Sequence, residues 1–83
     1  MNVAVRYFAS VREALGNGEA AQIDAGADIA ALRAALVARG GRHAEALGRA
    51  KVLRSARNRV LCSEDTPLVE GDEVAFFPPL TGG

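Results

Sequence analysis

The first third of the chain shows the alternation of apolar and polar residues that predicts paired strands. Val3, Val5 and Tyr7 lie two positions apart, so residues 3–8 are predicted to form a strand with one buried face. Residues 19–24 alternate more weakly and follow a glycine-rich turn. This pattern predicts a second strand that pairs with the first.

The strongest helical pattern follows this strand pair. Asp28 can cap the N-terminus of a helix whose buried side carries Ile29, Leu32 and Leu36, and Gly40 lies where the helix should end. The spacing of three and four residues places these apolar side chains on one stripe. This segment is predicted to be the main helix of the domain.

Two shorter helices are predicted on either side of the main helix. Ser10 and Glu13 fit a capping box for a helix over residues 11–15, and Gly16 can end it in a left-handed conformation. A further helical turn is predicted over residues 43–47.

The second half of the chain predicts strands at residues 52–53, 57–62 and 73–77. In the middle strand, Val60 and Cys62 share the face that should meet the core. The order of these elements, two strands followed by a long helix and then further strands, predicts an α+β domain. Its mixed sheet should pack on one main helix. A ubiquitin-like β-grasp roll is the simplest such fold, and it places the first and last strands side by side and parallel at the sheet centre.

Length and composition limit the other possibilities. The 83 residues suit one small domain, and 49% hydrophobic with 24% charged residues predicts a globular chain. Ten basic and ten acidic residues give a net charge of zero, so the overall charge does not predict binding to nucleic acid or to an anionic membrane. No apolar run approaches ~18 residues and the start does not resemble a signal peptide, so a cytoplasmic protein is predicted.

Side-chain chemistry gives few candidates. His43 is the only histidine, and its Arg- and Gly-rich surroundings predict a solvated side chain. Cys62 cannot form an internal disulfide and is predicted to be a small buried residue. Glu70, Asp72 and Glu73 flank a glycine without metal-ligand spacing, so a solvated turn is predicted and no metal site.

The C-terminal segment is the most distinctive part of the sequence. Proline fixes its own φ and restricts the residue before it, so Phe77-Pro78-Pro79 should continue the last strand as an extended rod. We therefore predict a β-grasp domain over residues 1–77 and a flexible tail over residues 78–83 that reaches about 20 Å. Its terminal carboxylate, on a residue without a β-carbon, is the group that we expect to carry the chemistry after activation by a partner.

Two motifs, DEVAFFPPLTGG at residues 72–83 and FASVRE at residues 8–13, resemble the small, sulfur-carrier subunits of molybdopterin synthases. The resemblance implies a β-grasp fold in which Gly83 is adenylated by an ATP-consuming partner and converted to a thiocarboxylate. The sulfur then passes to cyclic pyranopterin monophosphate, which forms the dithiolene of the molybdenum cofactor. The residues implied to line a slot in the partner are Gly82, Thr81 and Leu80.

The resemblance also implies the partners. These are a large subunit that carries the catalytic residues in an expected heterotetramer, the activating enzyme and a sulfur donor system. The chain would not be an enzyme on its own and would bind no cofactor permanently. It would also bind neither nucleic acid nor a membrane. Phe8, Leu61 and Phe77 are implied to dock, and the alternation of their strands independently places them on the nominally polar face.

Two alternatives stay open at this point. A thiocarboxylate carrier of another pathway, such as thiazole synthesis for thiamine, would also end in Gly-Gly. A non-catalytic nucleic-acid module could use the segment from Arg39 to Arg59, which has seven basic residues and one acidic residue but no aromatic residue. Salt-dependent nucleic-acid binding would favour the module, and terminal adenylation would favour a carrier.

Overall fold

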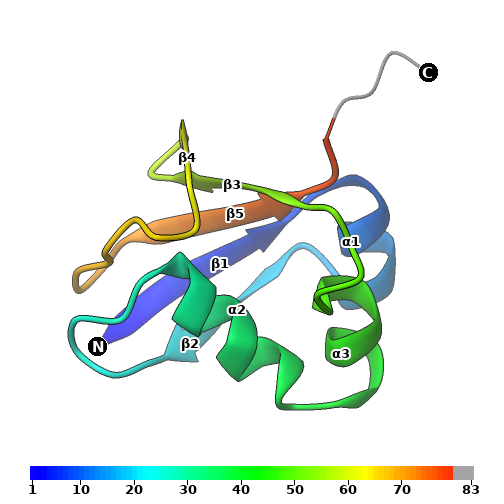
Figure 1. The fold of residues 1–83 in the computed structure, drawn as a ribbon, viewed down its shortest axis with the longest axis horizontal. Helices are drawn as coiled ribbons and strands as arrows, with labels where there is room; N and C mark the ends of the chain where they lie inside the picture. Colours follow the sequence, from blue (N-terminus) through cyan, green and yellow to red (C-terminus); the bar gives the residue numbers. More distant parts are fainter. Residues whose placement is uncertain (80–83) are drawn as a thin grey trace.

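A computed structural model describes residues 1–79, and this part of the chain folds as a five-stranded sheet with three helices (Figure 1). The elements in chain order are β1 (Asn2–Tyr7), α1 (Ala9–Leu15), β2 (Gly18–Gln22), α2 (Ile29–Val37), α3 (Gly41–Leu47), β3 (Arg54–Arg57), β4 (Val60–Cys62) and β5 (Glu73–Phe77). Among residues 1–79, no helix has both the length and the apolar character needed to cross a bilayer.

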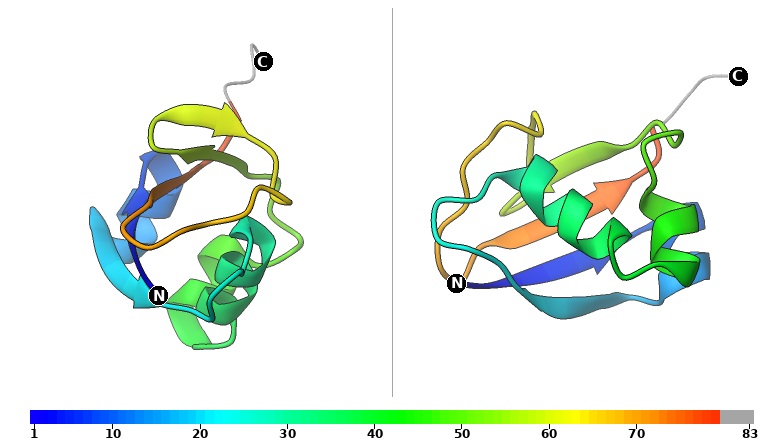
Figure 2. Two further views of the ribbon diagram at one scale, coloured as in Figure 1. Left: turned by 90° about the vertical axis from the view of Figure 1, so that its left-hand side faces the viewer. Right: turned by 60° about the horizontal axis from the view of Figure 1, so that its bottom comes forward.

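The sheet is mixed, with the first and last strands together at its centre. The strand order is β2-β1-β5-β3-β4, and β1 runs parallel to β5 whereas the other neighbours are antiparallel. Helices α2 and α3 lie on the same side of the sheet (Figures 1 and 2). This arrangement confirms the predicted α+β, β-grasp architecture.

The core fills the space between the sheet and α2. The predicted members Ile29, Leu32 and Leu36 are buried in one cluster with Val5, Val74 and Phe76, and the same cluster includes Val3, Tyr7, Val11, Leu47 and Leu68. The prediction that Val60 belongs to the core is wrong, because its side chain is 68% exposed. Val60 lies on β4, a short edge strand that extends beyond the packed face.

The main helix begins as predicted and the first helix does not. Asp28 Oδ1 accepts a hydrogen bond from the Ala31 N–H at 2.8 Å, which satisfies one of the free donors in the first turn. Helix α1 begins earlier than predicted, with Phe8 as an N-cap that makes no side-chain hydrogen bond, so Ser10 lies inside the helix. Gly16 ends it with a φ of 88°, as predicted for this position.

The predicted strand over residues 57–62 is two strands joined by a tight turn. Asn58 and Arg59 have φ values of 50° and 70°, the left-handed pair that closes a two-residue hairpin. Strand β3 ends before this turn and β4 begins after it. The strand predicted at residues 52–53 is also wrong, because these residues lie in the loop before β3.

His43 is part of a polar cluster and is not the solvated side chain that the sequence predicts. Its Nε2 lies 2.7 Å from Glu19 Oε2, and the Tyr7 hydroxyl donates to the same oxygen at 2.7 Å. Arg39 donates to the other Glu19 oxygen. Burial alone would raise the pKa of Glu19, but the hydrogen bonds from His43, Tyr7 and Arg39 outweigh it and hold that pKa at about 2. The cluster ties β1 and β2 to α3 and to the residues after α2.

Replacing Leu32 tests the packing of α2 on the sheet. Leu32 is fully buried, so Leu32→Ala should lower the free energy of unfolding by ~2–5 kcal/mol in chemical denaturation, because a cavity replaces buried methyl groups. The exposed Val60 provides the control, and Val60→Ala should change it by less than ~0.5 kcal/mol. Equal losses for the two variants would contradict the assignment of the core.

Glu19→Gln tests the polar cluster through its pH dependence. A carboxylate whose pKa falls from 4.5 to about 2 on folding stabilises the fold fully above pH 4.5, and this contribution is lost as the pH falls through 2. Between pH 7 and pH 3 the parent chain should therefore lose more unfolding free energy than Glu19→Gln. Glu45→Gln is the control, since this exposed α3 carboxylate has no hydrogen bond or ion pair within residues 1–79. Parallel curves for the parent chain and Glu19→Gln would show that the cluster does not act this way.

Candidate functional site

The sheet face opposite α2 brings together the three residues predicted to dock. Register pairs Ala75 of β5 with Ala56 of β3, and Ala56 in turn with Leu61 of β4, so these side chains share this face. Phe77 lies two residues after Ala75 and has the same orientation. Phe8 is 39% exposed and Leu61 is 59% exposed, which leaves large apolar side chains uncovered.

A hollow of about 520 Å³ lies on this outer face. Its apolar lining comes from Phe8, Ala9, Ala56, Ala75, Phe77 and Pro78. The small alanine side chains form its floor, and the two phenylalanines border it. Phe8 and Phe77 thus lie around one concavity, whereas Leu61 lies beside it on the same face.

Charged residues also line this hollow, and the sequence did not predict their role. Arg6 Nη1 and Arg59 Nε lie 3.6 Å and 3.7 Å from the two carboxylate oxygens of Glu73. The Arg6 guanidinium lies 5.7 Å from the centre of the Phe8 ring, within cation–π range. Strand alternation could have placed Arg6 beside Phe8. The position of Arg59 beside Glu73 depends on the turn at Asn58 and Arg59, which was not predicted from the sequence.

The β3–β4 hairpin is held in place by Asp72, which corrects the prediction of a solvated turn. The buried Asp72 carboxylate accepts hydrogen bonds from the Val69 N–H at 2.8 Å and from Asn58 Nδ2 and Arg57 Nε at 2.9 Å each. The Val69 hydrogen bond, with those from Asn58 and Arg57, outweighs burial and lowers the pKa of Asp72 below its usual value. The hairpin that carries Leu61 and Arg59 is therefore fixed to the start of β5.

The base of the tail leaves the end of β5 beside the loop before β3. Val52 and Leu53 of this loop line two small hollows, one with Pro78 and the other with Pro79. Val52 is largely exposed and was not predicted as a site residue. The predicted reactive and slot residues Gly83, Gly82, Thr81 and Leu80 lie outside the described residues.

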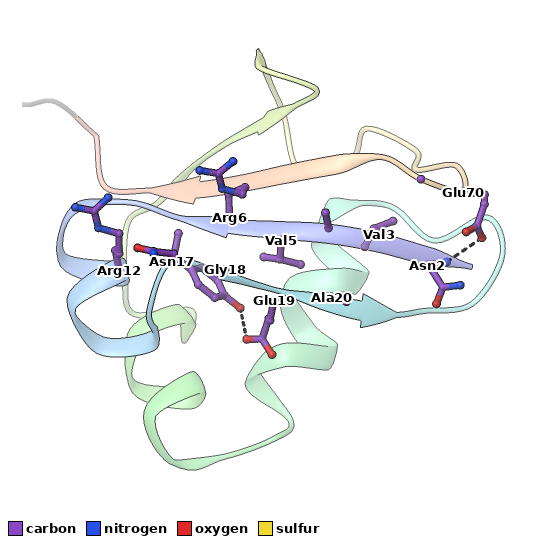
Figure 3. A pocket seen from close by; sticks show the side chains of 13 residues that line it. Asn2, Val3, Val5, Arg6, Arg12, Asn17, Gly18, Glu19, Ala20 and Glu70 are labelled. Carbon is purple, nitrogen blue, oxygen red and sulfur yellow. Dashed lines mark hydrogen bonds between the residues drawn. The ribbon is translucent and has the colours of Figure 1, made fainter.

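Other candidate groups have structural roles. Cys62 is partly buried against the core, as predicted for a small apolar residue. A second hollow of about 650 Å³ follows β1 and β2 (Figure 3), where the Asn2 N–H donates to Glu70 at 2.9 Å. This hydrogen bond joins the start of β1 to the loop before β5. Within residues 1–79, no group of three or more His, Cys, Asp or Glu side chains is placed to hold a metal ion.

Comparison with known proteins places this geometry in a family. Residues 5–83 match the model of the ThiS family. The molybdopterin synthase sulfur carrier subunit of Escherichia coli is 46% identical over 98% of this chain and 99% of that protein, and the subunit of the same name from Haemophilus influenzae is 39% identical over 95% and 96%. A solved structure from Helicobacter pylori, described as a protein–protein complex of subunits 1 and 2 of molybdopterin-converting factor, is 32% identical over the full length of both chains with a TM-score of 0.69. The chain therefore belongs to the ThiS family and is related over nearly its whole length to molybdopterin synthase sulfur carrier subunits.

Proposed function

We propose that this chain is the sulfur-carrier subunit of a molybdopterin synthase and that the carboxylate of Gly83 carries the sulfur. The observation that supports this most strongly is where the chain leaves the sheet. Strand β5 is paired on both sides, so it delivers Phe77 and Pro78 from the centre of the sheet beside an uncovered apolar hollow. This geometry suits a body that docks outside a partner while its terminus enters it.

The chemistry follows from the low reactivity of a carboxylate. The Gly83 carboxylate attacks the α-phosphorus of ATP on an activating enzyme, which releases pyrophosphate and leaves an acyl-adenylate. A hydrosulfide-equivalent nucleophile then displaces AMP to give the thiocarboxylate. A terminal glycine leaves the carbonyl carbon open to attack because it has no β-carbon. ATP is consumed by the activating enzyme and is not a resident cofactor.

The thiocarboxylate then donates its sulfur to cyclic pyranopterin monophosphate within a large subunit. On this proposal the catalytic side chains belong to the large subunit, and this chain acts as a protein co-substrate. Leu80, Thr81 and Gly82 would line the slot that receives the tail. The Helicobacter pylori relative was solved as a complex of two subunits, which supports such a partner.

The nucleic-acid alternative is weakened by the ion pairs of the basic segment. Arg39 pairs with Glu19, Arg57 pairs with Asp72 and Arg59 lies beside Glu73. Arg39 and Arg57, two of the seven basic residues in this segment, are therefore engaged within the fold and are less available to a phosphate backbone. A thiocarboxylate carrier for thiazole synthesis shares the proposed terminal chemistry, and conversion of the pterin precursor distinguishes the two pathways.

Phe8→Ala tests the docking role of the outer face. This substitution should weaken association with the large subunit by ~1–4 kcal/mol, because it removes an aromatic side chain that borders the hollow, while stability changes little. Val69→Ala is the control, since Val69 is exposed and does not line that hollow. Lost stability with unchanged association for Phe8→Ala would place Phe8 in the core instead.

Changes of tail length test whether the terminal carboxylate is the reactive group. Removing Gly83, or adding one residue after it, displaces the reactive carbon by about 3.5 Å. Either variant should stay folded, by circular dichroism, and yet lose conversion of the pterin precursor, since group transfer tolerates far smaller displacements. Gly82→Val keeps the length and should also block conversion, because a β-branched side chain fills the slot.

Cys62→Ala completes this test as the control for sulfur carried on a side chain. The variant should keep most of its sulfur-transfer activity, since Cys62 packs against the core. If Cys62→Ala loses transfer while a chain extended beyond Gly83 remains active, the sulfur is carried on the cysteine and the proposal fails.

A further inference from the structure

We infer that Arg6 and Arg59 make the outer-face hollow selective for a large-subunit segment that presents an apolar side chain next to a carboxylate. This inference rests on the proposed function and names the partner chemistry that its docking surface selects. The apolar side chain would occupy the hollow between Phe8 and Phe77. The carboxylate would lie at the charged end of the hollow, between the two arginines.

The charge balance of the hollow supports this choice of partner. Two guanidinium groups, those of Arg6 and Arg59, lie beside a single carboxylate, Glu73, at 3.6 Å and 3.7 Å. These distances are longer than those of direct charge-assisted hydrogen bonds. The side chains of Arg6 and Arg59 are also 47% and 85% exposed, so both can turn toward an incoming acidic group. Among residues 1–79, the ion pairs around the hollow leave one positive charge in excess, and register adds Arg54 beside Phe77 on the same face.

The apolar part of the hollow supports the other half of the recognition. Its floor consists of Ala56 and Ala75, whose short side chains leave room for a larger one from the partner. Arg6 lies over the Phe8 ring, which places its charge at the border between the apolar and charged parts. The hollow therefore combines shape and charge in the manner of a docking pocket.

The backbone at Arg59 provides an independent reason to assign it a function. Arg59 has a φ of 70° at the second position of a two-residue hairpin turn, where glycine is strongly favoured after asparagine. An L-residue there strains the backbone, and strain of this kind concentrates at binding sites. The arginine side chain is mostly exposed, and within residues 1–79 its one ion pair is the long one with Glu73. The fold alone would favour glycine at this position.

The test measures association of the full chain with its own large subunit at low and high ionic strength. Arg59→Glu and Arg6→Glu should each slow association about 10-fold at low salt, because charge steering acts on the encounter rate. The difference should shrink near 1 M salt, where the screening length is only ~3 Å. Glu73→Gln should act in the opposite direction and speed association, since it frees both arginines.

Two further variants separate this role from a structural one. Arg59→Gly should raise the thermal unfolding midpoint and still slow association, because it relieves the turn while removing the charge. Arg42→Glu is the matched control: it makes the same charge change on an exposed residue of α3, on the other side of the sheet, and should leave association unchanged (Figure 1).

The outcomes also separate this inference from the proposed function. If Arg59→Glu and Arg42→Glu slow association equally, or neither does, while the parent chain still converts the pterin precursor, the inference is wrong and the function stands. If the parent chain never forms a thiocarboxylate, the function itself fails. If Arg59→Glu abolishes binding to single-stranded DNA but leaves large-subunit association unchanged, the hollow recognises phosphate and the inference is overturned.

Discussion

The parallel pairing of β1 with β5 is the interaction on which the rest of the structure depends. Val5 pairs with Val74 and Tyr7 with Phe76, and all four side chains are buried on the helix side. Because β5 also pairs with β3, its end cannot shift without breaking two ladders. The point where the chain leaves the domain is therefore fixed by the most deeply packed part of the sheet. A carrier whose terminus must reach a distant reaction centre needs such a fixed origin.

On the proposed function, one face of the sheet stabilises the fold and the other recognises the partner. The inner face and α2 bury aliphatic and aromatic side chains, which supplies most of the hydrophobic stabilisation. The outer face leaves Phe8, Leu61 and Phe77 beside a hollow on the side of the sheet away from α2 and α3. A partner can therefore dock there without disturbing the core. Stability and binding should respond to different substitutions, as the variants of Leu32 and Phe8 are designed to show.

Strong periodic signals predicted most of the framework, and non-local contacts explain the failures. Strand β1, the Asp28-capped helix and β5 follow from alternation and helical spacing, which depend on local sequence. The turn at Asn58 was not predicted because Arg59 occupies its second position, where a glycine would have indicated a hairpin. The burial of Asp72 and the engagement of His43 were missed for another reason. Asn58 lies 14 residues from Asp72, and Glu19 lies 24 residues from His43. The composition around Asp72 and His43 therefore wrongly predicted exposure to solvent.

The central claim is that sulfur is carried on the terminal carboxylate of Gly83, and intact-mass analysis of the chain from its native host tests it most directly. The account predicts a species in which one oxygen is exchanged for sulfur, and fragmentation should place that exchange at the C-terminal residue. Treatment that hydrolyses thiocarboxylates should return this species to the mass of the unmodified chain. An added sulfur that maps to Cys62 instead, with an unmodified C-terminus, would contradict the account.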